Sequence, residues 1–532
     1  MSRLSILVSS TIFSMASWCW AVSYEAADCS YDEINALASA ESLADGDSII
    51  VPACPETIWD SPLVITKAIT LQGAGMDLTT ITGNLSSVTG IIQYHPAEPD
   101  PDHRFRLTGF TFDNGGLSNI AHLSQDTTTP EYVRIDHNKF IMSTTGRGIY
   151  IVGTIFGVAD NNIFESSAGV ISFYGNDAVQ WNGVPRIYGD ENNFYFEDNI
   201  VNKTSDGISG SGQGGRYVHR YNTVTTLSTT GMTEFHGNQP GGSYDGGGNA
   251  STMMVEIYGN DWTSGSAIGN VIDQRGGQAL IYMNNLTVPG MSWMYAREEY
   301  TDDQWPDNPG WVQHVTNSYQ WANWQSGNIL LVTAVNTEEN CCIDTSPWQA
   351  NHFYGSSDIT CQKFTGDPDG NCWKRSNNPT PSSDPYYSHA TTEPDWASVP
   401  VRGQILDGDV YWLNMGPNDT PLALNVDLWV QSATGAFDGT GSASSGGGVG
   451  CGTLADRPAT CTTGVGYWAT DQSCTDLTGM VGKNPSTPIS GTLYKCTAPD
   501  TWTAYYTPYT YPHPLREGDA VAPAAPTGLV VL

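Results

Sequence analysis

The stretch VRIDHNKFIM, which begins at Val133, opens a phrase that recurs along the chain. The phrase returns as VADNNIFESS at Val158, YFEDNIVNKT at Tyr195, VHRYNTVTTL at Val218 and EIYGNDWTSG at Glu256. Each copy is a short run of β-branched and aromatic residues with an Asn near its middle. These residue types favour β-strands, and no copy shows the periodicity of a helix. The repetition therefore predicts an array of similar β-units.

The Asn of each phrase sets the register of the array, at intervals of 24, 37, 23, 38 and 24 residues. A period in this range is typical of stacked supersecondary units, and the two longer intervals each carry an insert of about 14 residues. Stacked strands lie about 4.8 Å apart, so identical residues form ladders. We therefore predict an all-β, right-handed parallel β-helix with six Asn in successive turns: Asn138, Asn162, Asn199, Asn222, Asn260 and Asn284.

The segment DGDSIIVPACPETIWDSPLVITKAITLQGAG (45–75) resembles the N-terminal entry of secreted β-helix proteins of the pectate-lyase-like superfamily. The stretches GVGYWATDQ and YTPYTYPHPL resemble the C-terminal parts of such proteins. The resemblance implies a short capping helix before the first rung, in SYDEINALASAES. It specifies the fold and leaves the activity open, because this architecture carries lyases, hydrolases, esterases, tailspikes and adhesins.

The termini and the cysteines predict an exported, disulfide-bonded chain. MSRLSILVSSTIFSMASWCWA reads as a secretory signal peptide, and no later segment is apolar and long enough to span a membrane. Ten cysteines follow it, and we expect five disulfides, one of them between Cys29 and Cys54. The predicted organisation is a signal peptide (1–21), an N-terminal cap (22–64), the β-helix (65–340), a Cys-rich continuation (341–516), and a linker with the start of a truncated module (517–532).

The formal net charge of −34 argues against partners that are themselves polyanions. Nucleic acid and anionic membrane surfaces are disfavoured on this ground. A strongly acidic polysaccharide would need a local basic cleft or a bound cation.

Strand alternation predicts two outward strips of polar residues. In the first strip, two residues before each Asn, the sequence places Asp136, Asp160, Glu197, Arg220, Tyr258 and Tyr282. In the second strip, from the next strand of each turn, it places Tyr174, Ser211, His236 and Arg275. We predict that the two strips form the two sides of a groove. Glycines next to the residues of the second strip would let a bulky substrate approach closely.

Aromatic and charged residues near the strips match the surfaces that bind sugar rings. The candidates for substrate binding are Trp181, Arg186, Tyr244, Trp293, Arg297 and Trp305. We therefore expect a polysaccharide as the partner.

A β-helix lyase needs a base, a cation that holds the uronate carboxyl group and a proton donor near the glycosidic oxygen. The candidate catalytic residues are His236, Arg275, Arg220, Tyr174 and Tyr258, with His236 or Arg275 as the base. Asp136, Asp160 and Glu197 are candidate ligands of Ca²⁺. The predicted function is β-elimination on a polysaccharide that contains uronic acid. A non-catalytic polysaccharide-binding adhesin or surface protein is one alternative. A glycoside hydrolase with Glu234 as a further candidate acid is another.

Overall fold

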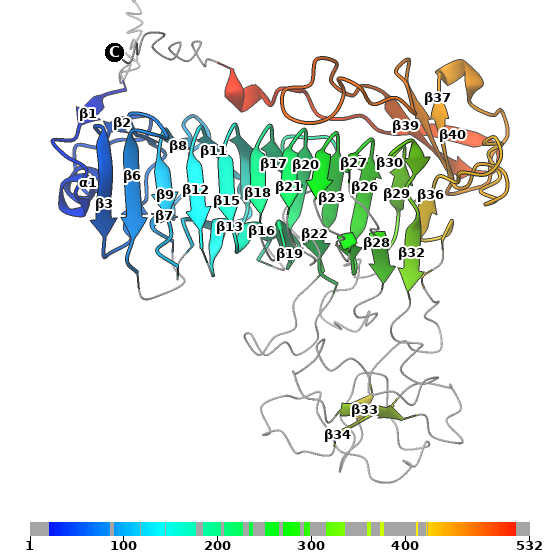
Figure 1. Cartoon of the computed structure of the whole chain (residues 1–532), viewed down its shortest axis with the longest axis horizontal. Helices are drawn as coiled ribbons and strands as arrows, with labels where there is room; N and C mark the ends of the chain where they lie inside the picture. The colour runs from blue at the N-terminus through cyan, green and yellow to red at the C-terminus, as the bar shows by residue number, and fades with distance from the viewer. Residues whose placement is uncertain are drawn as a thin grey trace, which may run out of the picture.

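The computed structural model describes residues 21–85, 90–116, 119–143, 145–176, 185–203, 207–226, 233–237, 251–264, 270–287, 292–297, 315–335, 359–362, 373–376, 411–412, 422 and 424–517. The described strands wind into a right-handed coil with three long faces (Figure 1). Each turn contributes one strand to each face, and neighbouring turns pair in parallel. The predicted fold, a right-handed parallel β-helix, is therefore confirmed.

We name the three faces sheets A, B and C. Sheet A contains β1 (Ser23–Glu25), β2 (Ser48–Ile50), β5 (Thr70–Gln72), β8 (Phe105–Thr108), β11 (Glu131–Asp136), β14 (Ile155–Asp160), β17 (Phe194–Glu197), β20 (Arg216–Arg220), β23 (Met254–Tyr258), β26 (Gln278–Tyr282), β29 (Ser318–Trp321) and β36 (Leu428–Val430). Sheet B contains β3 (Cys54–Trp59), β6 (Thr79–Gly83), β9 (Thr111–Asp113), β12 (Lys139–Met142), β15 (Ile163–Ser166), β18 (Ile200–Lys203), β21 (Thr223–Thr226), β24 (Asp261–Ser264), β27 (Asn285–Thr287), β30 (Trp324–Gln325) and β31 (Asn328–Ile329). Sheet C contains β4 (Leu63–Ile65), β7 (Ile92–Tyr94), β10 (Ala121–Gln125), β13 (Arg147–Gly153), β16 (Gly169–Tyr174), β19 (Ser209–Gly212), β22 (Thr233–Phe235), β25 (Asn270–Gln274), β28 (Ser292–Arg297) and β32 (Val332–Val335).

The predicted Asn ladder lies at the corner between sheets A and B. From Asn162 on, the Oδ1 atom of each Asn accepts from the backbone N–H and the side-chain amide of the Asn one turn before it. All six predicted Asn residues are fully buried, and Asn323 extends the ladder by one turn. The residue before the Asn has a positive φ, as at Asp198 (54°) and Tyr221 (56°), which makes a one-residue corner. The Asn side chains satisfy the backbone groups that these corners expose.

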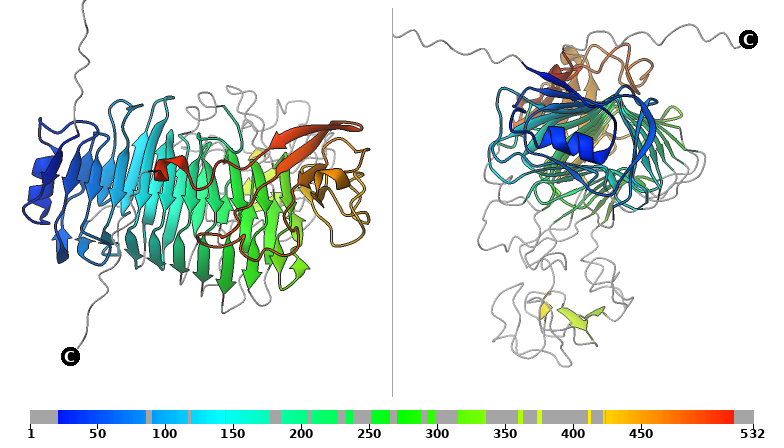
Figure 2. Two further views of the ribbon diagram at one scale, coloured as in Figure 1. Left: turned by 90° about the horizontal axis from the view of Figure 1, so that it is seen from above. Right: turned by 90° about the vertical axis from the view of Figure 1, so that its left-hand side faces the viewer.

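The inside of the coil is filled by stacked apolar side chains. Phe140 and Phe164 stack in parallel on adjacent turns, with their ring centroids 4.8 Å apart. The N-terminal end of this core is covered by α1 (Tyr31–Ala38), which Ser30 caps through a hydrogen bond from the backbone N–H of Glu33 (Figure 2). The first full turn, β2 to β4, lies within residues 48–65 and so begins inside the range predicted as the cap. In the described residues no helix has the length and hydropathy to cross a membrane.

After β36, residues 431–517 return along the coil toward its N-terminal end (Figures 1 and 2). They form a four-stranded sheet of β37 (Val449–Gly452), β38 (Gly466–Ala469), β39 (Thr492–Ala498) and β40 (Thr501–Tyr506), with short helices η2 (Leu454–Asp456) and η3 (Pro514–Arg516). Three further strands pair with each other as a small antiparallel sheet: β33 (Ile359–Gln362), β34 (Trp373–Ser376) and β35 (Tyr411–Trp412).

The segment 501–517, which we call the strap, covers the outer face of sheet A. Arg220 of β20 donates to the backbone oxygens of Tyr509 and Thr510. Arg516 of the strap pairs with Glu197 of β17 at 2.8 Å and with Asp160 of β14 at 3.3 Å. The strap therefore joins strands that lie about 290 to 360 residues earlier in the chain, and it closes this face of the coil.

A buried carboxyl group beneath the strap predicts a pH-dependent stability. Glu256 accepts from the hydroxyl of Tyr506 at 2.5 Å and from the backbone N–H of Gly189 at 2.7 Å. Burial raises the pKa of Glu256 to about 7. Between pH about 4.5 and 7 the native state holds a proton that the unfolded chain has lost, so this group lowers stability progressively as the pH rises through that window.

Glu256→Gln is therefore expected to raise the melting temperature at pH 8 and to change it little at pH 4. At pH 8 the gain should be on the order of 2–3 kcal/mol in the free energy of unfolding. Burial likewise raises the pKa of Glu131 to about 7, so part of the pH dependence persists in this variant. Glu165→Gln, on the exposed side of sheet B, is the control. Equal shifts of Glu256→Gln at both pH values would contradict the assignment.

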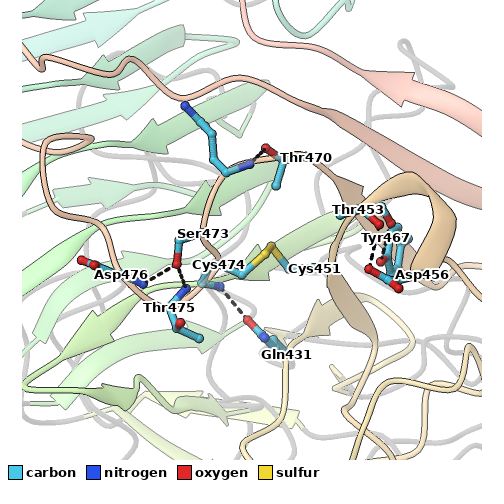
Figure 3. Close-up of a disulfide and its surroundings, with 12 residues drawn as sticks. Gln431, Cys451, Thr453, Asp456, Tyr467, Thr470, Ser473, Cys474, Thr475 and Asp476 are labelled. Atoms are coloured by element: carbon cyan, nitrogen blue, oxygen red, sulfur yellow. Dashed lines mark hydrogen bonds between the residues drawn. A yellow bond between two sulfur atoms is a disulfide. The ribbon is translucent and has the colours of Figure 1, made fainter.

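Three disulfides lie in the described residues: Cys29–Cys54, Cys451–Cys474 and Cys461–Cys496. The first confirms the predicted N-terminal pair, and the second ties β37 to the loop after β38 (Figure 3). The side chains of Cys341, Cys342, Cys361 and Cys372 lie outside the described residues. We expect these four to be paired as well. Thiol titration of the denatured, unreduced mature protein should find no free thiol, and one or more equivalents would refute this prediction.

Candidate functional site

The strands of sheet C follow one another along the coil (Figure 1), and their outward positions bring together polar residues from successive turns. Two columns of outward side chains run along the outer face of sheet C, because neighbouring strands pair in register. One column contains His122, Tyr150, Ser172, Gly210, Glu234, Asp273 and Tyr295. The second contains Ser124, Val152, Tyr174, Gly212, His236 and Arg275, the last two just beyond the ends of β22 and β25. The predicted residues Tyr174, His236 and Arg275 thus share one column.

A charged cluster forms around Arg275. Its guanidinium donates to Asp273 at 3.0 Å through Nε and to Glu234 at 2.9 Å through Nη2. Its Nη1 lies 3.2 Å from Nδ1 of His236, and Nε2 of His236 lies 3.7 Å from Oε2 of Glu234. The side chains of Glu234 and His236 are 37% and 25% exposed, whereas that of Arg275 is 12% exposed. The cluster therefore presents an imidazole and a carboxylate to solvent above a largely covered arginine.

A gap without side chains lies between this cluster and Tyr174. Both outward positions of β19 are glycines, Gly210 and Gly212, whereas the flanking strands carry side chains there. A Cβ atom added to Gly210 would meet nothing within 4 Å. One added to Gly212 would lie 3.5 Å from the ring of Tyr174 and 3.9 Å from Cβ of His236. Gly212 is therefore buried beneath these two side chains, and the gap is open at Gly210, which is half-buried.

Toward the N-terminal end of sheet C, aromatic rings continue the face beyond the gap. The ring centroids of His122 lie 5.0 Å from Tyr150 and 5.1 Å from His95, and Tyr150 lies 5.7 Å from Tyr174. Burial lowers the pKa of His122 to about 4, and it also lowers the pKa of His95. The rings of His95, His122 and Tyr150, which we call the aromatic row, are therefore uncharged at neutral pH. Ring faces of this kind stack against the apolar faces of sugars.

The structure separates Arg220 and Tyr258 from this site. Both point outward from sheet A, as alternation predicts, but both are completely buried under the strap. Arg220 pairs with Glu197 at 2.5 Å and donates to the hydroxyl of Tyr258 at 3.0 Å. A polymer in solution cannot reach them, so the prediction that they are catalytic and that this strip walls an open groove is corrected.

The three carboxylates predicted to bind Ca²⁺ are held by arginines. Asp136 pairs with Arg106 at 2.6 Å, Asp160 pairs with Arg134 at 2.9 Å, and Arg220 and Arg516 share Glu197. The guanidinium groups of Arg106 and Arg134 help to hold the pKa of Asp136 below its usual range, against the effect of burial. Within the described segments, no group of three or more His, Cys, Asp or Glu is placed to hold a metal ion. We therefore propose no calcium site at these residues.

Of the six predicted substrate-binding residues, the structure describes the side chains of two, Trp293 and Arg186. Trp293 is 2% exposed and belongs to the hydrophobic core, so its prediction is wrong. Arg186 is exposed in the loop before β17, between two residues whose backbone oxygens accept from Arg216 of sheet A. For Arg297, only the backbone in β28 is described. Three of the predicted residues lie outside the described ones: Trp181, Tyr244 and Trp305.

Sequence reasoning assigned no role in the lyase site to Glu234, Asp273, Tyr150 or His122. Glu234 and Asp273 stand two residues before His236 and Arg275, so strand alternation places each pair on one face. The same rule applied to the preceding turns would have found Tyr150 and His122. The signal was present in the sequence, but only the register of the coil shows which turns adjoin.

The fold and this face define the class of protein, a right-handed parallel β-helix with one outer face covered and one carrying half-buried polar and aromatic residues. No protein-family model matches the sequence, and no curated protein matches it. Among solved structures, the A-module of the mannuronan C-5 epimerase AlgE4 of Azotobacter vinelandii is similar at 12% identity, over 55% of this chain and 90% of that chain, with a TM-score of 0.25. ORF18 of Geobacillus virus E2 is similar at 14% identity, over 65% of this chain and 61% of that chain, with a TM-score of 0.23. Similarities this weak carry no argument about activity or substrate.

Proposed function

We propose that the outer face of sheet C binds a polysaccharide and catalyses β-elimination on a polymer that contains uronic acid. The observation that carries the proposal is the gap at Gly210, which the strand of Tyr174 borders on one side and the cluster of His236 borders on the other. A sugar ring in this gap would have groups capable of proton transfer on both sides.

The contacts of His236 assign its part in the reaction. An elimination needs one group that removes the proton beside the carboxyl group and another that gives a proton to the glycosidic oxygen. Arg275 has only donors, so in its contact with Nδ1 of His236 that nitrogen is the acceptor. The neutral imidazole then carries its proton on Nε2. His236 therefore donates this proton to the leaving oxygen while the Arg275 guanidinium stabilises the charge left on the ring, and the ring then takes up the proton that the base has removed from carbon.

Removal of the proton from carbon is assigned to an oxygen that borders the gap, on Tyr174 or Glu234. Arg275 is not assigned as the base, because its guanidinium stays charged between Asp273 and Glu234. Tyr174→Phe and Glu234→Gln separate the two oxygen groups, since only the variant that lacks the base should lose the elimination step while it still binds substrate.

Two other functions would give different results. Hydrolysis needs two carboxyl groups, and Glu234 and Asp273 are register neighbours on adjacent strands. Both accept hydrogen bonds from Arg275, however, whereas a hydrolase needs one carboxylic acid free to give its proton to the glycosidic oxygen. A non-catalytic binding protein would use the aromatic row alone.

The decisive experiment incubates the purified protein with a panel of acidic and neutral polysaccharides. The ultraviolet absorbance of the unsaturated product and the number of new reducing ends are followed together. A rise in both supports the proposed lyase. New reducing ends without unsaturated product would replace it with a hydrolase, and retention on a polysaccharide without turnover would replace it with a binding protein.

A further inference from the structure

Arg147 stands at the start of β13, outside the cluster described above, and its side chain crosses to the next strand. A Cβ atom added to Gly169 of β16 would lie 2.4 Å from Cδ and 2.6 Å from Nε of Arg147. The side chain therefore runs over Gly169, where any larger residue would block it. At the end of this path, Nε donates to the hydroxyl of Ser172 at 3.0 Å.

The partners of Arg147 are uncharged, unlike those of Arg275. Besides Ser172, its guanidinium donates to the backbone oxygen of Gly146 at 2.9 Å. Among the residues that the structure describes, Arg147 forms no ion pair with a carboxylate. Arg275, by contrast, is shared by Asp273 and Glu234, so its charge is already balanced. Arg147 thus supplies an uncompensated positive charge to the described part of this face, in a chain whose formal net charge is −34.

The position of Arg147 relates it directly to the gap. Arg147 contacts Ser172, which is paired in register with Gly210 of the next strand. A Cβ atom added to Gly210 would meet nothing within 4 Å. Glu234 follows on the strand beyond. The guanidinium therefore stands on the Tyr174 side of the gap, about two strand spacings, or roughly 9.6 Å, from the turn that carries Glu234.

We infer that Arg147 binds the carboxylate of the sugar unit that lies over Gly210, and so selects uronate polymers. The inference rests on the proposed function of this face and identifies its specificity residue. A guanidinium matches a carboxylate geometrically with two parallel hydrogen bonds, which a lysine cannot reproduce. In an elimination the same contact withdraws charge from the carbon whose proton is removed.

The test compares binding of acidic and neutral forms of the same polymer. Affinity electrophoresis measures the dissociation constants of wild type, Arg147→Gln and Arg147→Lys for polygalacturonate, alginate and glucuronan, each beside its carboxyl-reduced form. Wild type should prefer at least one uronate polymer to its reduced form by about 10- to 100-fold. Arg147→Gln should lose that preference without weaker binding of the reduced form, and Arg147→Lys should retain part of it. Lys139→Gln, a cation on sheet B that pairs with Glu165, is the matched control.

The outcomes distinguish this inference from the function on which it rests. If wild type binds none of the polymers, the proposed function fails and the inference with it. If wild type prefers a uronate polymer and Arg147→Gln keeps the full preference, only the role of Arg147 is overturned. Equal weakening of acidic and reduced forms would show a packing role instead. Binding of dextran sulfate as tight as that of the uronate polymer, and lost in Arg147→Gln, would overturn the assignment to a carboxylate.

Discussion

Replacing His236 with alanine should lower turnover of the polysaccharide substrate by about 10²- to 10⁴-fold, the usual effect of losing a positioned proton-transfer group. The imidazole is 25% exposed beside the glycine gap, and Arg275 fixes which of its nitrogens carries the proton. Binding should change little, because the aromatic row and Arg147 remain. Initial rates and dissociation constants measured on the same substrate separate the two effects.

Two further variants make this result specific to proton transfer. His236→Gln keeps an acceptor for Arg275 but cannot exchange a proton, so its turnover should fall as far as that of His236→Ala. His103→Ala removes an imidazole that is 46% exposed in the loop before β8, and it should retain full turnover. Unchanged turnover in both His236 variants would place the catalytic site elsewhere.

Replacing Asn222 with alanine should lower the free energy of unfolding by about 3–5 kcal/mol, because it leaves several buried backbone groups without partners. Its side-chain amide donates to the backbone oxygens of Phe196 and Arg220 at 2.8 and 3.0 Å. Its Oδ1 accepts the backbone N–H of Asn199 at 3.0 Å. No other side chain can take these places in a corner from which water is excluded. Urea and thermal unfolding of the whole protein measure the effect.

Asn202 provides the matched control, since it is exposed on β18, three residues after Asn199 of the ladder. Asn202→Ala should change the free energy of unfolding by no more than about 0.5 kcal/mol. A loss below about 1 kcal/mol for Asn222→Ala would show that the corner rearranges and finds other partners.

The part of the candidate site that sequence could predict followed from the same periodicity as the fold. Tyr174, His236 and Arg275 occur in equivalent places of successive turns, so stacking brings them into one column. Arg147 had no such signal, because it begins its strand and reaches its place by crossing Gly169 of the next turn. Trp293 was misjudged because an aromatic side chain in a short strand suits the core as well as a sugar-binding surface.

The sequence by itself determined the coil, its register and the side on which each strand residue lies. These properties are local or periodic: alternation fixes whether a side chain points into or out of the coil, and the Asn interval fixes which turns adjoin. Which outward face stays open was decided only by the tertiary structure. Glu197 and Arg220 read as a solvent-facing strip, yet Arg516 and the backbone of Tyr509 cover them from about 290 to 320 residues away. No repeat encodes that contact, because the docking of the strap depends on buried charge pairs between segments without sequence similarity.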